Sequence, residues 1–340
     1  MGHSSAANHG IRIEGVQFRS FRGEDDFSPM VAIMNACNRV DRAEYNESVE
    51  DVAHVFAHLK NCEPSRDMLF AQVGDVPIAW SRVFWKDESD GPRLYCSLGF
   101  VAPPFRRRGL GSYLLRWCEA RLQAISLNHS SETQKVFHVW TTDAVPGEIK
   151  LYEESGYHVA RTMVAMTRST KQNLPLRRLP KGLEVRPAQS SHYRAVWDAW
   201  EEAYRDHWGY SPRTENDFVA WQKSRMFQPE LWKIAWDGGD VAGLVLNCID
   251  ERRNEWLGID RGYTQYVFVR RPWRRRGLAR ALLTESIRMF TALGMTETYI
   301  GVDTESPSGA DVLYSSLGYR PYQRHLIYRK PLSNRARLWE

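Results

Sequence analysis

The sequence repeats itself, and this repetition constrains the fold more than any other feature. GFVAPPFRRRGLG corresponds to YVFVRRPWRRRGLA, with Gly109 and Gly277 as their loop glycines. LYEESGY corresponds to LYSSLGY, and VQFR corresponds to LEVR. The tripeptide GDV also occurs once in each half. The four matches occur in the same order in both halves. The two members of each match are separated by nearly the same number of residues, close to half the length of the chain. Such a period far exceeds the roughly 20–50 residues of a solenoid repeat, so the pattern predicts two copies of one domain.

The length of the chain agrees with two domains, because 340 residues are too many for one ordinary core. The copies meet in TKQNLPLRRLPKG, which is rich in proline and basic residues and is typical of a linker. We predict an N-terminal domain over residues 11–170, a linker over 171–181 and a C-terminal domain over 182–332, the last being the catalytic one.

Each copy shows the same succession of patterns. A short strand is followed by helical stretches, a hairpin that turns at GDV, and a strand that runs into the arginine-rich loop. A helix starts at the loop glycines, and a strand, a helix carrying Leu-Tyr and a last strand complete the copy. The predicted fold class is α/β (α+β), with two tandem domains that each contain a mixed, mostly antiparallel sheet flanked by helices.

The helix that starts at the glycines is amphipathic in both copies. Residues at helical spacing predict its buried face. They are Leu114, Cys118, Leu122 and Ile125 in the first copy, and Leu278, Leu282, Met289 and Leu293 in the second.

Composition excludes several classes of protein. No apolar run approaches the length of a membrane span, and MGHSSAANHG lacks the apolar core of a secretory leader. The five cysteines are scattered without a Cys-x-x-Cys pair, which favours reduced thiols in the cytoplasm and argues against a metal site. A net charge of +5 suits an anionic small ligand as well as a nucleic acid.

The Arg-Gly loop has the sequence of an anion-binding turn. A strand ends, glycines allow close approach, and the N-terminus of the next helix leaves N–H groups unpaired, which together form a cradle for pyrophosphate. No Gly-Lys-Ser/Thr follows, so the loop is not a P-loop, and Gly-x-Gly-x-x-Gly of dinucleotide-binding folds is absent. A solvated basic face or a nucleic-acid patch remains the alternative.

These residues and their context resemble the GCN5-related N-acetyltransferase (GNAT) superfamily. Its Arg/Gln-x-x-Gly-x-Gly/Ala signature is matched twice, and its later Leu-Tyr element is matched around Tyr152 and Tyr314. Two fused copies resemble the mycothiol synthase family in particular. The signature residues are Arg106, Gly109 and Gly111 in the first copy, and Arg274, Gly277 and Ala279 in the second.

The resemblance implies acetyl-CoA as the cofactor. Its pyrophosphate would lie over the Arg-Gly loop, and its pantetheine arm would pair with the strand before the loop. The implied cofactor-binding residues are Val267, Phe268, Val269, Arg274, Arg275, Arg276, Gly277, Leu278, Ala279 and Arg280, with Gly99, Phe100, Val101, Arg106, Arg107, Arg108, Gly109, Leu110, Gly111 and Ser112 as their counterparts.

Acetyl transfer requires a base for the amine and a proton donor for the leaving thiolate. The resemblance implies Tyr314 as that donor, with Tyr152 as its counterpart, and packing of a helix is the alternative role for both. The family commonly places a glutamate base on the strand before the loop, but Tyr263 and Tyr95 occupy those positions. The substitutes that we consider are Asp260, Asp303, Glu305 and His207. The second copy is the predicted catalyst because Ala310 precedes Tyr314 by four residues, as the family pattern requires.

A segment rich in aromatic residues, from Trp197 to Trp221, is expected to wall the acceptor cleft. Trp197, Trp200 and Tyr204 are spaced as the core face of a helix, so packing is the favoured role for these three. The residues that we assign to the substrate are Tyr204, Asp206, His207, Trp208 and Tyr263.

The sequence therefore predicts a cytoplasmic, acetyl-CoA-dependent N-acetyltransferase that transfers acetyl directly to a small-molecule amine in a ternary complex. Neither a membrane nor a nucleic acid is an expected partner, and the chain is expected to be a monomer or homodimer. Two alternatives stay open: acetylation of a protein or peptide amine, and a non-catalytic module that binds acyl-CoA, which the missing glutamate favours.

Overall fold

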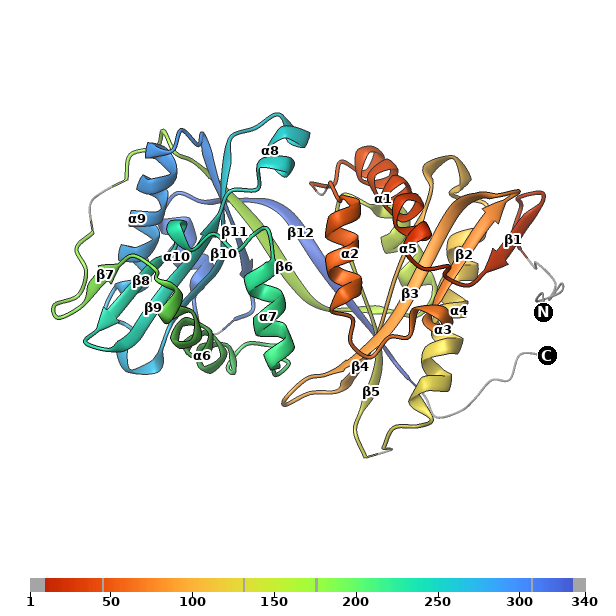
Figure 1. The fold of residues 1–340 in the computed structure, drawn as a ribbon, viewed down its shortest axis with the longest axis horizontal. Helices are drawn as coiled ribbons and strands as arrows, with labels where there is room; N and C mark the ends of the chain where they lie inside the picture. The colour runs from red at the N-terminus through yellow and green to blue at the C-terminus, as the bar shows by residue number, and fades with distance from the viewer. Residues whose placement is uncertain (1–9, 45, 131, 175–176, 307, 333–340) are drawn as a thin grey trace. The chain divides into compact units, whose positions relative to one another are not determined.

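The computed structural model describes residues 10–44, 46–130, 132–174, 177–306 and 308–332, and it divides the chain into two compact units. The first unit comprises the residues up to Arg161 together with those from Leu326 onward, and the second comprises Thr162–His325. Each unit is a mixed sheet flanked by helices (Figure 1), as the repeat predicts. The predicted fold class is therefore present in both halves.

The first unit holds its strands in the order β1-β2-β3-β4-β5, followed by the C-terminal part of β12. Strands β1 to β4 are antiparallel, whereas β4 and β5 are parallel. Its elements are β1 (Val16–Arg19), α1 (Phe27–Asp41), α2 (Val49–Ala57), α3 (Pro64–Asp67), β2 (Met68–Val73), β3 (Val76–Asp87), β4 (Arg93–Val101), α4 (Leu110–Ser126), β5 (Lys135–Thr142) and α5 (Pro146–Glu154).

The second unit holds its strands in the order β6-β11-β10-β9-β8-β7, with β10 and β11 as the parallel pair. Its elements are β6 (His158–Ser169, from Thr162 onward), β7 (Glu184–Arg186), α6 (Tyr193–Tyr204), α7 (Glu215–Lys223), β8 (Lys233–Asp237), β9 (Asp240–Cys248), α8 (Glu251–Leu257), β10 (Arg261–Val269), α9 (Leu278–Ala292), β11 (Glu297–Asp303), α10 (Ala310–Ser316) and β12 (Arg320–Pro331, up to His325).

The GDV segments form tight hairpins, as predicted. In the first unit Val73 pairs with Val76, and in the second Asp237 pairs with Asp240, so two residues make each turn. The first residue of each turn is a glycine in the left-handed region, Gly74 at φ 57° and Gly238 at φ 59°. Glycine adopts this conformation without the steric cost that a Cβ would add.

Each unit is completed by a strand whose sequence lies in the other repeat. In the first unit, Tyr328 of β12 packs into the core with Tyr95 and Leu122, and the N–H of Leu332 donates to the carbonyl of Lys135 at 3.0 Å. In the second, β6 pairs antiparallel with β11 from Met163 to Ser169. The boundaries 11–170 and 182–332 remain a prediction about the repeats, since the compact units divide the chain inside β6 and β12.

The long helix after each Arg-Gly loop buries most of the face that its periodicity predicts, whereas Ile125 and Met289 are half-buried and one residue is exposed. In α4, Leu114, Cys118 and Leu122 are buried. In α9, Leu278 and Leu282 are buried, but Leu293 is 48% exposed, so its predicted burial is wrong. The reason is that α9 ends at Ala292 and Leu293 forms its C-cap.

Because the C-terminal part of β12 completes the first unit, a core mutation there should destabilise the first unit and not the second. Tyr328 is 1% exposed, and Tyr328→Ala removes an aromatic ring from the first core, which costs about 3–5 kcal/mol. Hydrogen exchange should then accelerate in β4, β5 and α4, while β9 to β11 keep their protection. Tyr322→Ala, at a 50% exposed position of the same strand, is the control and should leave β4, β5 and α4 protected. Equal loss of protection in β9 to β11 would contradict the assignment of this strand to the first unit.

Candidate functional site

The two Arg-Gly loops have the same backbone. The second arginine of each triplet, Arg107 or Arg275, has a positive φ, at 60° and 64°. The glycine that caps the following helix is also left-handed, Gly109 at φ 88° and Gly277 at φ 81°. Left-handed backbone at a non-glycine residue costs on the order of 1–3 kcal/mol and clusters at functional sites. The same unusual turn in both copies therefore marks both loops as candidate sites.

The first arginine of each triplet folds back onto the strand that precedes it. The Nε of Arg106 donates to the carbonyl of Val101 at 3.0 Å, and the Nε of Arg274 donates to the carbonyl of Val269 at 2.9 Å. The remaining guanidinium nitrogens meet a carboxylate at the end of the helix that opens the copy. Arg106 contacts both oxygens of Asp41 at 2.6 and 2.7 Å, and Arg274 contacts Asp206 at 3.2 Å. These two arginines hold the loop in place.

The helix N-termini behind the loops carry N–H groups that are unpaired within the helix, and at α4 the carbonyl of Gly10 lies close to the capping Gly109. Neither α4 nor α9 has a side chain that caps its first turn. Their first N–H groups have no partner within the helix, and the helix dipole adds about half a positive charge there. Arg107, Arg108, Arg275 and Arg276 lie beside them, in the loop itself. This arrangement suits a pyrophosphate.

The strand before each loop parts from its parallel neighbour. Pairing of β4 with β5 runs from Arg93 to Cys96, and pairing of β10 with β11 runs from Arg261 to Thr264. Beyond these points the described ladders continue only on the antiparallel side, to β3 and β9. Each parted edge carries backbone N–H and C=O groups that an extended ligand can pair with.

In the first unit a cavity of about 190 Å³ lies where β4 parts from β5. It reaches from the parted strand past the Arg-Gly loop to α5. The polar groups that reach it include Cys37 of α1, Cys118 of α4, and Glu148 and Tyr152 of α5. Several predicted cofactor residues line it, namely Gly99, Phe100, Val101, Arg106, Arg107, Gly109, Gly111 and Ser112.

In the second unit, aromatic side chains gather near the parted strand. Tyr204 stacks on His207 with ring centres 4.2 Å apart and meets Tyr266 of β10 edge-on at 5.6 Å. Burial raises the pKa of the Tyr204 hydroxyl, and the neighbouring hydroxyls of Tyr266 and Tyr314 raise it further. Burial lowers the pKa of His207, against the opposing effects of Asp303 and Asp206, so this imidazole is neutral at pH 7.

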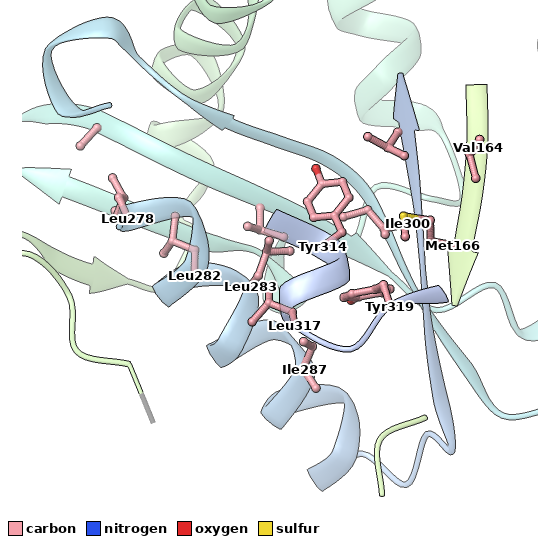
Figure 2. Close-up of a cluster of buried hydrophobic side chains, with 14 residues drawn as sticks. Val164, Met166, Leu278, Leu282, Leu283, Ile287, Ile300, Tyr314, Leu317 and Tyr319 are labelled. Atoms are coloured by element: carbon pink, nitrogen blue, oxygen red, sulfur yellow. The ribbon is translucent and has the colours of Figure 1, made fainter. Parts of the chain in front are cut away.

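Tyr314 lies at the edge of the second core. It is 6% exposed and packs among Leu278, Leu283 and Tyr319. Its hydroxyl points away from Leu317 and Ile287, out of the cluster (Figure 2). Burial raises the pKa of this phenol above its ordinary value, so it stays protonated and can donate.

The structure separates the other predicted substrate residues. Asp206 pairs with Arg271 and Arg274 and so anchors the loop. The hydroxyl of Tyr263 donates to Asn254 at 2.9 Å. Tyr263 lies at the far end of β10, about 20 Å from Val269, because a strand rises about 3.3 Å per residue. Trp208 is 36% exposed. Trp197 and Trp200 are buried in an aromatic core, as expected for a packing face.

Among the substitutes for the base, Asp303 lies near His207, and its side chain accepts from the N–H of Glu305 at 3.1 Å. Asp260 immediately precedes β10, at the end of that strand away from the loop. His207 and Asp303 are thus the two candidates that the fold brings together.

Sequence reasoning missed Asp41, Cys37, Tyr266 and the position of Glu148 in the cavity. Asp41 had a detectable signal, because it precedes Asp206 by the same offset that separates the two GDV turns. Cys37 and Tyr266 have no such signal, since only packing brings them to the site. Among the described residues no group of three or more potential ligands gathers as a metal site, and no helix there is long and apolar enough to cross a membrane.

Known proteins resemble this chain in sequence and in structure. The model of the acetyltransferase (GNAT) family matches residues 30–157 and 193–319. A mycothiol acetyltransferase of Parafrankia sp. (strain EAN1pec) is 24% identical, over 90% of this chain and 96% of its own. A GCN5-related N-acetyltransferase from Sphaerobacter thermophilus has a similar structure, with a TM-score of 0.70 and 26% identity over 94% of this chain and 96% of its own. A tandem GNAT protein from the clavulanic acid biosynthesis pathway shares the fold, with a TM-score of 0.64 and 13% identity over 94% of this chain and 99% of its own.

The loop glycines differ in what surrounds them, which leads to a prediction. A Cβ at position 109 would lie 2.0 Å from the carbonyl oxygen of Gly10, whereas a Cβ at position 277 meets nothing within 4 Å. Gly277→Ala should cost only the left-handed strain, about 1–2 kcal/mol. Gly109→Ala should cost clearly more, because Gly10 and Ile11 must move. Urea unfolding of both variants measures the difference, and equal costs would contradict the contact with Gly10.

Proposed function

The chain belongs to the acetyltransferase (GNAT) family and is an N-acetyltransferase; from this we propose that it transfers acetyl from acetyl-CoA to the amine of a small molecule, directly, with both substrates bound. The observation that carries the proposal is the loop geometry. An uncapped helix N-terminus, a left-handed turn and a parted strand edge occur together, twice.

We place acetyl-CoA along this geometry in each unit. The pyrophosphate lies on the N–H groups that begin α4 or α9, beside the loop arginines. The pantetheine arm adds to the parted edge of β4 or β10 in the manner of a strand. Arg106 and Arg274 contribute by holding the turn, because their guanidinium groups are already engaged by the strand carbonyl and by an aspartate.

We assign the principal reaction to the second unit. His207 is half-buried and neutral at pH 7, so it can take the proton of the attacking amine. The Tyr314 hydroxyl gives a proton to the leaving thiolate. A bulge in β10 at Gln265 sits between the pairs Thr264–Asn247 and Tyr266–Leu246, where the strand parts from β11. Bulges redirect backbone groups, and an N–H of β10 aimed at the thioester oxygen would stabilise its developing charge.

A small molecule is the proposed acceptor. The relative from Parafrankia is a mycothiol acetyltransferase, and its sequence aligns over nearly its whole length. Tyr204, His207 and Tyr266 present an aromatic wall to such a ligand. Acetylation of a peptide amine is the rival, and a panel of amino sugars, amino acids, polyamines and short peptides distinguishes the two by CoA release.

Calorimetric titration tests the donor site with a matched pair of variants. Gly111 and Ala279 occupy equivalent places in the first turns of α4 and α9, two residues after the loop glycine of each copy. Wild type should bind two acetyl-CoA per chain. Gly111→Asp and Ala279→Asp should each remove one site, because an aspartate there repels the pyrophosphate while satisfying the helix N-terminus. No binding by wild type would refute the proposal.

The chemistry of the second unit has its own test. Tyr314→Phe should lower kcat/KM by at least about 10²-fold and leave acetyl-CoA affinity unchanged. Because the pKa of His207 is lowered, kcat/KM of the wild type should stay constant as the pH falls to about 6.5 and should decrease only at lower pH. In His207→Gln this decrease at low pH should be absent. Tyr322→Phe is the control. A wild-type rate in Tyr314→Phe would exclude this proton donor.

A further inference from the structure

We propose that the first unit is a second acetyl-transfer centre, in which Glu148 is the general base and Tyr152 the proton donor. The inference rests on the proposed function, since it takes acetyl-CoA as the donor at the first loop. It adds a catalytic carboxylate at a place where the second unit has none.

The cavity of the first unit joins the donor elements to these two side chains. Its wall includes Gly99 to Val101 of the parted strand, the Arg-Gly loop, and both Glu148 and Tyr152. Glu148 and Tyr152 stand four residues apart on α5 and so project from one face of the helix, separated by one turn. The thioester of an acetyl-CoA that pairs with β4 would reach the part of the cavity that Glu148 and Tyr152 line.

Glu148 is oriented by a single hydrogen bond. The Thr141 hydroxyl of β5 donates to Oε2 at 2.6 Å, which fixes the carboxylate and leaves Oε1 to accept from a ligand in the cavity. Burial raises the pKa of Glu148, and the Asp41 carboxylate adds to the rise, while Thr141 and Arg106 oppose it. A carboxylate with a raised pKa is a stronger base than one in water.

The other groups that face this carboxylate do not compete for the role. Cys37 of α1 donates its S–H to the carbonyl of Val101 at 3.2 Å, and burial raises its thiol pKa. Cys118 of α4 is buried, and burial raises its pKa to about 12. Arg106 and Asp41 are paired with each other. Burial also raises the pKa of Tyr152, which keeps its hydroxyl protonated and able to donate.

The reaction balances with these two groups. The amine nitrogen forms a bond to the acetyl carbon, and the carbon–sulfur bond breaks. The nitrogen gives a proton to Glu148, the departing thiolate takes a proton from Tyr152, and the proton on Glu148 returns to Tyr152 through solvent. The products are the acetylated amine and the free thiol of CoA.

The second unit differs at this position. Ala310 stands four residues before Tyr314, where Glu148 stands before Tyr152. The second unit therefore draws its base from elsewhere, and the two centres place their bases on different elements of the fold. Two centres of different design in one chain predict different preferences for the acceptor amine.

The test isolates the first unit and uses hydroxylamine as the probe, because it is small enough for the cavity and forms acetohydroxamate, which is measured directly. Ala279→Asp silences the second loop, and calorimetry confirms that one acetyl-CoA still binds. This variant should form acetohydroxamate above the uncatalysed rate. Adding Glu148→Gln should lower that rate by about 10²–10⁴-fold and remove the acidic limb of its pH profile.

A matched control lies on the same helix. Glu154, exposed and paired with Lys150, stands at the C-terminal end of α5, and Glu154→Gln should leave the rate and the pH profile unchanged. Equal melting temperatures of the two variants show that the fold is intact. Acetyl-CoA binding at the first loop without acetohydroxamate, or an unchanged rate in Glu148→Gln, would overturn this inference alone. No acetyl-CoA binding by wild type would overturn the proposed function as well.

Discussion

An arginine that turns back onto its own strand fixes the geometry on which both sites depend. The guanidinium of Arg106 or Arg274 holds the last strand carbonyl and an aspartate from the opening helix. Charge-assisted pairing of this kind positions a planar group in a defined plane. The next arginine is thereby held in a left-handed conformation, and the helix begins without a side-chain cap. Without this anchor the turn would relax, and the anion cradle would lose its shape.

The anchor also links the Arg-Gly loop of each unit to the helix that opens the copy. Asp41 ends α1 and Asp206 follows α6, and both helices pack against the sheet near the strand before the loop. In the first unit Cys37, one turn before Asp41, reaches the same carbonyl of Val101. The Arg-Gly loop and the helix that opens each copy are therefore held together by one small cluster of charges.

Duplication preserved this cluster while the surrounding side chains diverged. The first unit has a cavity that Glu148 lines, and the second packs tryptophan and tyrosine rings of α6 against its sheet. The exchange of strands adds a further constraint. Since Tyr328 completes the first core and Val164 and Met166 complete the second, neither repeat contains its whole fold. Each compact unit therefore needs residues from both repeats.

The sequence alone determined the features that depend on local order along the chain. The repeat, the hairpin turns, the glycines of the loop and the face of α4 follow from spacing and from the conformations that glycine allows. Tertiary structure decided the rest, because it depends on residues far apart in sequence. Only packing could place Asp41 against Arg106, set Asp206 on the loop, send Tyr263 to the far end of β10, and bring Glu148 into the cavity. It also decided that the last strand of each repeat completes the other unit, since strand pairing is a long-range interaction that periodicity does not encode.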